Sequence, residues 1–107
     1  MRDLQISTLE TIPGREIVKH LGIVQGNTVR AKHLGRDIMA GLKNIMGGEL
    51  KGYTELLTDS REECMARMLD DAHALGANAV VGVRFTTSSI SEGVSELFAY
   101  GSAVIIS

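Results

Sequence analysis

The alternation of apolar and polar residues predicts two strands in the first thirty residues. Side chains alternate from Leu4 to Thr8, and the Pro-Gly pair at 13–14 then breaks the chain, so a short strand and a turn are expected. From Arg15 to Val29 the apolar residues fall on both parities and many are β-branched, while Gly22 and Gly26 would weaken a helix. We therefore predict a second strand that is apolar on both faces, which requires cover on both.

The middle of the chain has helical spacing. A first helix is predicted because apolar residues recur at intervals of three and four, at Leu34, Ile38, Leu42 and Ile45. Gly47-Gly48 would end this helix, because glycine takes up positive φ without strain.

A second, longer helix is predicted from Glu49 to Leu75, with Gly76 as its C-cap. Its core-facing stripe has a period close to the helical one and consists of Leu50, Tyr53, Leu57, Cys64, Met68 and Leu75. Glu63 and Arg67 stand at i,i+4 beside the stripe, where they can form an ion pair. At ~1.5 Å per residue this helix is about 40 Å long, so it should project from a small domain or pack on another subunit.

The C-terminal third has strand periodicity again. We predict a strand over Ala79–Phe85, a hydroxyl-rich loop over Thr86–Ser91, and a long antiparallel last strand after Gly93 that reaches Ile106. The predicted order is β-β-α-α-β-β, an α+β fold with two helices on one face of a mostly antiparallel sheet. The 107 residues correspond to a single domain, 1–107, since domains commonly have ~100–200 residues.

The predicted strands carry more apolar surface than one subunit of this size can cover. A homo-oligomer is therefore expected, in which a second copy covers what the helices leave exposed.

Three glycine-rich motifs resemble the YbjQ-like family, whose members carry the label "putative heavy-metal-binding". They are residues 47–53 (GGELKGY), residues 76–83 (GANAVVGV) and residues 100–104 (YGSAV). The resemblance extends over essentially the whole chain. It implies a small α+β subunit similar to the dodecin type, assembled through its strands into a homopentameric ring, and it implies no known activity. Within the last motif, Gly101 stands among large neighbours and would let another backbone approach.

Composition and charge restrict the possible partners. Lys and Arg number 11 against 13 Asp and Glu, which gives a net charge of −2 and argues against a nucleic-acid or anionic-membrane binder. No apolar run follows the N-terminal residues or is long enough to span a bilayer, so a cytoplasmic protein is expected. A lone cysteine excludes an intramolecular disulfide and the zinc patterns that need cysteine pairs.

The strongest candidate metal ligands are Cys64 and Met68, which share one helix face with Met65 adjacent. Thiolate and thioether are ligands suited to Cu(I) and similar soft ions. The same face is the predicted core stripe, however, where a lone cysteine beside methionine commonly serves as packing. His73 lies half a turn around the helix from Cys64, so these two residues cannot share a site within one subunit.

Two other histidines are further candidates. His33 and Asp37 stand at i,i+4 on the first predicted helix and could hold a metal only with outside ligands. His20 lies within the second predicted strand, where a hydrogen-bonded or surface histidine is the usual case. In a ring, however, a single His20 or Cys64 per subunit could converge on the axis and supply several ligands.

The sequence contains no Gly-x-Ser-x-Gly, no phosphate loop and no His-Glu-x-x-His, so we expect no enzyme of those classes. Two functions stay open. The first is an oligomeric module that binds a small ligand or a heavy-metal ion, and the second is a scaffold that presents the charged face of the long helix, including Lys51, Glu55, Glu62 and Asp70, to a partner. A catalytic site built across subunits would be invisible in one chain.

Overall fold

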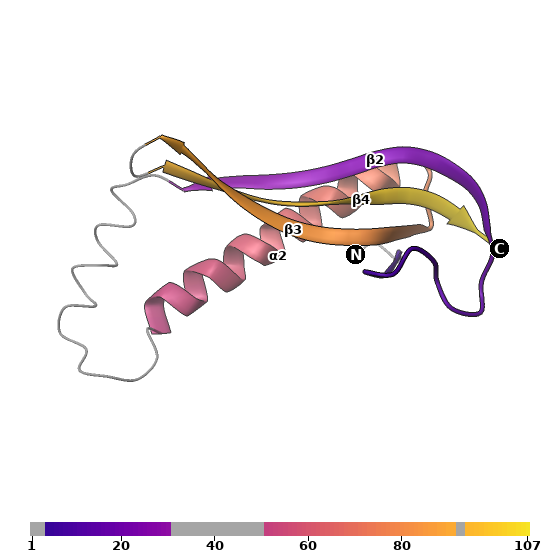
Figure 1. Ribbon diagram of the computed structural model, residues 1–107, viewed down its shortest axis with the longest axis horizontal. Helices are drawn as coiled ribbons and strands as arrows, with labels where there is room; N and C mark the ends of the chain where they lie inside the picture. Colours follow the sequence, from indigo (N-terminus) through magenta and orange to yellow (C-terminus); the bar gives the residue numbers. More distant parts are fainter. Residues whose placement is uncertain (1–3, 31–50, 92–93) are drawn as a thin grey trace.

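The described residues form an α+β fold in which one long helix crosses one face of a four-stranded sheet (Figure 1). The computed structural model describes residues 4–30, 51–91 and 94–107. Its elements are β1 (Gln5–Ile6), β2 (Ile17–Arg30), α2 (Lys51–Ala74), β3 (Ala79–Ser91) and β4 (Val94–Ile106). The first predicted helix, the Gly47-Gly48 turn and the His33–Asp37 pair lie outside the described residues.

The sheet is mixed, with strand order β1-β3-β4-β2. β4 is central and pairs antiparallel with β2 on one side and with β3 on the other. β1 pairs parallel with the first residues of β3, through Gln5 with Ala79 and Ile6 with Val80. The strands expected at both ends of the chain, and the antiparallel pairing of the last two, are therefore confirmed.

Helix α2 packs closely on β2 because Gly26 has no side chain. A Cβ at this position would lie 2.5 Å from the backbone nitrogen of Met68 and closer still to the carbonyl oxygen of Cys64. These distances are well inside van der Waals contact, so a larger residue would push the helix away. Gly26 thus sets the distance between the helix and the sheet.

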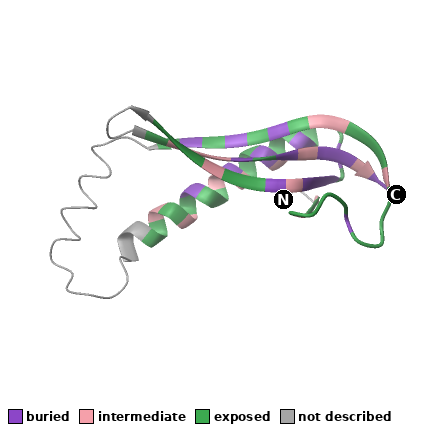
Figure 2. Ribbon diagram, viewed as in Figure 1, coloured by how far each residue is buried: buried purple, intermediate pink, exposed green. Residues whose placement is uncertain are grey.

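Two apolar cores lie on opposite faces of the sheet, because Val80 belongs to one core and its strand neighbours Ala79 and Val81 to the other. Figure 2 marks the buried positions of the strands and the helix in purple. The core beneath α2 is formed by Val24, Cys64, Met68, Ala72, Ala77, Val80, Val83, Ala99 and Ala103. The core on the other face is formed by Ile12, Ala79, Val81, Val104 and Ile106. Because Ile12 belongs to the connection between β1 and β2, that connection covers one end of this second face.

The prediction of apolar surface on both faces of β2 is confirmed only in part. Val24 is fully buried under α2, whereas its neighbour Ile23 points away from the helix and is 76% exposed. Val29, further along the same strand, is also exposed. The end of this face that Ile12 does not reach therefore presents apolar side chains to solvent.

The loop predicted over Thr86–Ser91 is wrong, because β3 continues to Ser91. The hydroxyl residues pair in register with β4, among them Thr86 with Phe98 and Thr87 with Leu97. Threonine is β-branched and suits a strand, and the ladder of β4 overrides the loop tendency of serine. The hairpin is therefore longer than expected.

The buried face of α2 also differs from the predicted stripe. Its fully covered positions are Ser60, Cys64, Met68 and Ala72, spaced by four. Leu57 and Leu75, both predicted to be buried, are 43% and 47% exposed. Figure 1 shows the reason for Leu57, since the N-terminal turns of α2 diverge from the sheet, and Leu75 follows the last helical residue.

Three local predictions are confirmed. The long helix ends at Ala74, two residues before a glycine in the left-handed region, Gly76, at φ +85°. Glu63 and Arg67 form the expected i,i+4 ion pair. A Cβ at Gly101 would lie 2.8 Å from a methyl of Val80 and 3.0 Å from the carbonyl oxygen of Val81, so the close backbone approach predicted there is present.

Candidate functional site

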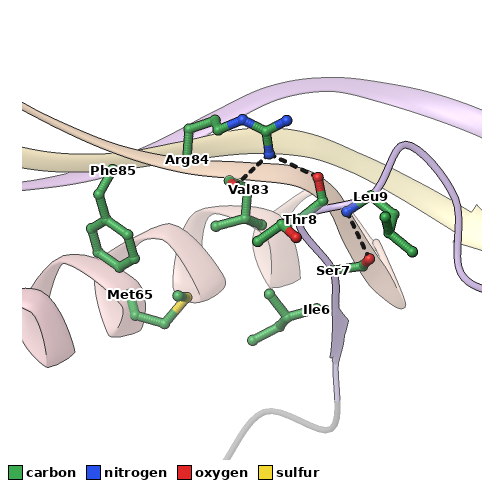
Figure 3. Close-up of a pocket in the computed structure, with 8 residues that line it drawn as sticks. All are labelled: Ile6, Ser7, Thr8, Leu9, Met65, Val83, Arg84 and Phe85. Carbon is green, nitrogen blue, oxygen red and sulfur yellow. Dashed lines mark hydrogen bonds between the residues drawn. The ribbon is translucent and has the colours of Figure 1, made fainter.

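An open apolar groove of about 650 Å³ lies between the N-terminal segment, α2 and β3 (Figure 3). It is lined by Ile6, Ser7, Thr8, Leu9, Met65, Val83, Arg84 and Phe85. Three of these carry large apolar side chains that are substantially exposed: Ile6 at 42%, Leu9 at 56% and Phe85 at 42%. A mostly apolar hollow of this size with a few polar groups is typical of sites for small molecules or chain segments.

A bulge in β3 shapes this groove. The register of β3 against β4 shifts between Val81 and Arg84, and Gly82 within the bulge has φ +63°. The amide of Gly82 donates to the carbonyl of Leu9 at 2.7 Å, and the amide of Val83 donates to that of Ser7 at 3.0 Å. A bulge thus turns two backbone donors outward, where they hold the N-terminal segment as one wall of the groove.

Arg84 is the cationic residue among those that line the groove. Its guanidinium donates from one nitrogen to the carbonyl of Thr8 at 2.7 Å and to that of Val83 at 2.9 Å. Figure 3 shows this guanidinium on the opposite side of β3 from the apolar side chains of Val83 and Phe85. Arg84 therefore holds the N-terminal segment against β3, and its charged group lies away from the apolar side chains of the groove.

The candidate soft-metal pair Cys64 and Met68 lies together in the core, and both residues are fully buried. The thiol of Cys64 donates to the carbonyl of Leu97 at 3.1 Å, and its sulfur lies 3.7 Å from the hydroxyl oxygen of Thr28. Because Thr28 and Leu97 are themselves a cross-strand pair, the sulfur sits over one rung of the sheet. A metal ion could reach it only if α2 moved away from the sheet.

His20 is placed far from that pair. It is exposed and stands opposite Val104, eight positions before Thr28 on β2, which corresponds to about 26 Å along a strand. His73 is exposed in the last turn of α2. Among residues 4–30, 51–91 and 94–107, no three His, Cys, Asp or Glu side chains come close enough to hold one metal ion.

The groove was not foreseen from the sequence. The sequence pattern singles out Met65 only as a neighbour of Cys64, whereas in the structure its half-buried side chain lines the groove. The sequence held a weak signal for it, because the alternation from Leu4 to Thr8 is shorter than the strand predicted over Ala79–Phe85. In the structure the difference is larger, with two residues in β1 and thirteen in β3. In the part of the chain that the structure describes, no helix has the length and apolar run that crossing a bilayer requires.

Known proteins are similar to this chain over nearly its whole length. Residues 4–107 match the model of a family described as "Putative heavy-metal-binding". A UPF0145 protein of Hahella chejuensis is 65% identical over 94% of this chain and 97% of its own, and one of Archaeoglobus fulgidus is 58% identical over 96% and 95%.

A crystal structure from Pediococcus pentosaceus shares the fold. That protein, with unknown function and of the DUF74 family, superposes with a TM-score of 0.61 at 14% identity over 97% of this chain and 98% of its own. The match to the family model over residues 4–107 and the sequence identity to the UPF0145 proteins show that the chain is a member of the YbjQ-like, or UPF0145, family.

Proposed function

We propose that this protein is a self-assembling binding module of the cytoplasm that takes an apolar small ligand in the groove between β1, α2 and β3. The observation that carries the proposal is the exposure of Ile6, Leu9 and Phe85 around one hollow, with Met65 and Val83 between them. Apolar side chains gathered in a hollow gain free energy when a ligand or a subunit covers them, at ~25 cal/mol per Å².

Self-assembly is the second part of the proposal. Large apolar side chains are also exposed outside the groove, notably Ile23 and Val29 on β2. Their burial between copies would favour an oligomer, and the family resemblance gives a pentameric ring of dodecin-like subunits as the expected form.

The groove is tested by titration with the apolar fluorophore ANS, comparing two variants with matched exposure. Leu9 lines the groove and is 56% exposed, whereas Val18 lies elsewhere and is 58% exposed. We expect Leu9→Ser to lower the bound fluorescence several-fold and Val18→Ser to leave it unchanged. Equal fluorescence in both variants would show that the groove takes no apolar ligand.

A heavy-metal ion is the second candidate ligand, and the exposure of His20 on β2 favours it. Imidazole is the commonest side-chain ligand for transition metals, and symmetry would multiply one histidine per subunit. Mass spectrometry under native conditions after incubation with zinc, copper and nickel tests this version. A bound metal that His20→Ala abolishes supports it, and an empty oligomer with all three metals contradicts it.

The scaffold alternative rests on the exposed carboxylates of α2, including Glu55, Glu62 and Asp70. It requires a partner whose binding depends on these charges. Pull-down with Glu55→Lys and Glu62→Lys variants distinguishes it, since loss of a partner with retained ANS binding would favour the scaffold.

A further inference from the structure

We infer that the face of the sheet opposite α2 binds a mononucleotide, with its base stacked on Phe98 and Tyr100 and its phosphate at Arg84. This site is separate from the apolar groove, which lies on the helix side of the sheet, and it does not depend on the groove or on self-assembly. The inference follows from the side chains that surround two aromatic rings on the central strand β4.

The two aromatic rings lie on the face away from the helix. Ala99 and Ala103 of β4 belong to the core beneath α2, and side chains alternate along a strand, so Phe98 and Tyr100 point the other way. Their ring centroids are 5.8 Å apart and their planes are inclined by 41°. Tyr100 is 38% exposed and Phe98 is half-buried. The two rings therefore hold each other in place and leave an aromatic surface open to a ligand.

Polar residues flank each ring in register, one on β2 and one on β3. They are Gln25 and Arg84 beside Tyr100, and Asn27 and Thr86 beside Phe98. Directly paired residues point to the same face, so these side chains and the two rings form two rows across three strands. With ~4.8 Å between strands and ~3.4 Å per residue, the rows cover about 10 Å by 7 Å, which is room for one planar ring system and a small substituent.

Arg84 supplies the positive charge of this face. Its guanidinium lies on the side of β3 away from Val83, and both hydrogen bonds that the structure gives it end on neutral backbone carbonyls, those of Thr8 and Val83 (Figure 3). These bonds orient the guanidinium and leave its charge uncompensated. A guanidinium presents several N–H donors in one plane and is well suited to a phosphate. An anionic group placed beside Tyr100 therefore complements the charge of this face.

The other end of the two rings carries groups suited to the edge of a base. The side-chain amide of Asn27 donates to the carboxylate of Glu96 at 2.9 Å, which holds the amide beside Phe98. Side-chain amides recognise bases by hydrogen bonding to their edges. Glu96 stands four residues from Tyr100 on β4, about 14 Å along the strand, so the negative charge lies away from the phosphate end.

A single nucleotide fits this face better than a nucleic-acid strand does. A strand requires a series of cations along its phosphates, whereas Arg84 is the one Lys or Arg among the residues that flank the two rings. The net charge of −2 for the whole chain also disfavours a polyanion.

Isothermal titration calorimetry of the wild-type protein with the four common nucleoside monophosphates tests the inference. We expect at least one to bind, its nucleoside to bind several-fold more weakly, and ribose 5-phosphate to bind more weakly by about tenfold or more, because it lacks the stacking ring. Tyr100→Leu should also weaken nucleotide binding by about tenfold. Arg84→Gln should weaken the nucleotide to the level of its nucleoside and leave the nucleoside unchanged, since only the phosphate contact is lost.

Phe85→Leu is the matched control. Phe85 is an aromatic residue of similar exposure, 42% against 38% for Tyr100, but it lies on the helix side of the sheet and lines the groove. This variant should bind the nucleotide as the wild type does. Circular dichroism and native mass spectrometry check that the variants keep the fold and subunit number of the wild type, and the comparison of nucleotide, nucleoside and ribose 5-phosphate needs no variant.

Four results would overturn the inference. Absence of binding for all four nucleotides would show that the face is not a nucleotide site. Ribose 5-phosphate bound as tightly as the nucleotide would indicate an anion site without stacking. Loss of binding in Phe85→Leu but not in Tyr100→Leu would place the ligand in the groove. A single-stranded oligonucleotide bound far more tightly than any mononucleotide would make the ligand a nucleic acid instead.

Discussion

Gly26 of β2 lies directly against the backbone of Cys64 on α2, with no room for a Cβ between them. The contact explains why the helix face over the sheet carries small residues, with Ser60, Cys64 and Ala72 all buried. Small side chains and a glycine let helix and strand backbones approach closely, and the larger Met68 fills the remaining space.

Gly26→Ala should therefore destabilise the protein strongly. The added methyl group meets backbone atoms of Cys64 and Met68, which cannot move without displacing the helix. We expect a loss of about 3 kcal/mol in the free energy of unfolding, the upper end of overpacking effects, measured by urea denaturation. The exposed neighbour Gln25 is the control, because Gln25→Ala should change stability by less than ~0.5 kcal/mol. A Gly26→Ala protein as stable as the Gln25→Ala control would show that α2 and β2 do not approach each other this closely at Gly26.

Cys64 should be unreactive while the protein is folded. Its thiol is fully buried and donates to the carbonyl of Leu97. Labelling with a thiol reagent should be at least tenfold slower in native buffer than in denaturing urea, and Cys64→Ala should leave any metal binding unchanged. Rapid labelling of the folded protein would indicate that the thiol is accessible, and would restore Cys64 as a candidate ligand.

The parts of the fold that depend on local sequence patterns were predictable, and the parts that depend on contacts between residues distant in sequence were not. Strand periodicity predicted β2 and β4, and helical spacing with Gly76 predicted the extent of α2. The buried face of α2 could not be predicted from large apolar residues, because the close approach at Gly26 depends on a residue distant in sequence. Leu57 fits the stripe and yet is exposed, since the direction of α2 carries its first turns away from the sheet.

The candidate site was less predictable than the fold. Cys64 and Met68 were correctly placed on one helix face, but the groove joins side chains from three segments far apart in sequence. The shape of the groove depends on the β3 bulge at Gly82. A glycine within an apolar strand occurs both in bulges and in regular pairing, so the sequence alone did not predict this bulge.

Arg67 should contribute more to stability than Arg61, although both are exposed on α2. Arg67 pairs with Glu63 and also donates to the backbone carbonyl of Asn27 on β2, whereas Arg61 donates to Thr58 on its own helix. We expect Arg67→Ala to cost about 1 kcal/mol, as one hydrogen bond to a charged donor, and Arg61→Ala less than half of that. Urea denaturation measures both, and equal losses would show that the link to Asn27 contributes nothing in solution.

Arg84→Ala should loosen the N-terminal segment without unfolding the domain. The guanidinium links β3 to the carbonyl of Thr8, next to the backbone bonds of Ser7 and Leu9. Loss of this link should accelerate hydrogen exchange at the amides of Gly82 and Val83, which donate to that segment, by about threefold to tenfold for ~1 kcal/mol of local stability. The amides of β4 should be unaffected, and a uniform increase over both strands would indicate global destabilisation instead.

Self-assembly is the central claim, and native mass spectrometry of the untagged wild-type protein tests it most directly because it counts subunits. The account predicts one closed oligomer whose mass is a whole multiple of 11.5 kDa, with five copies as the expected number. A monomer at concentrations where the fold is intact would contradict the account, because the exposed Ile23, Val29 and Phe85 would then have no second copy to cover them.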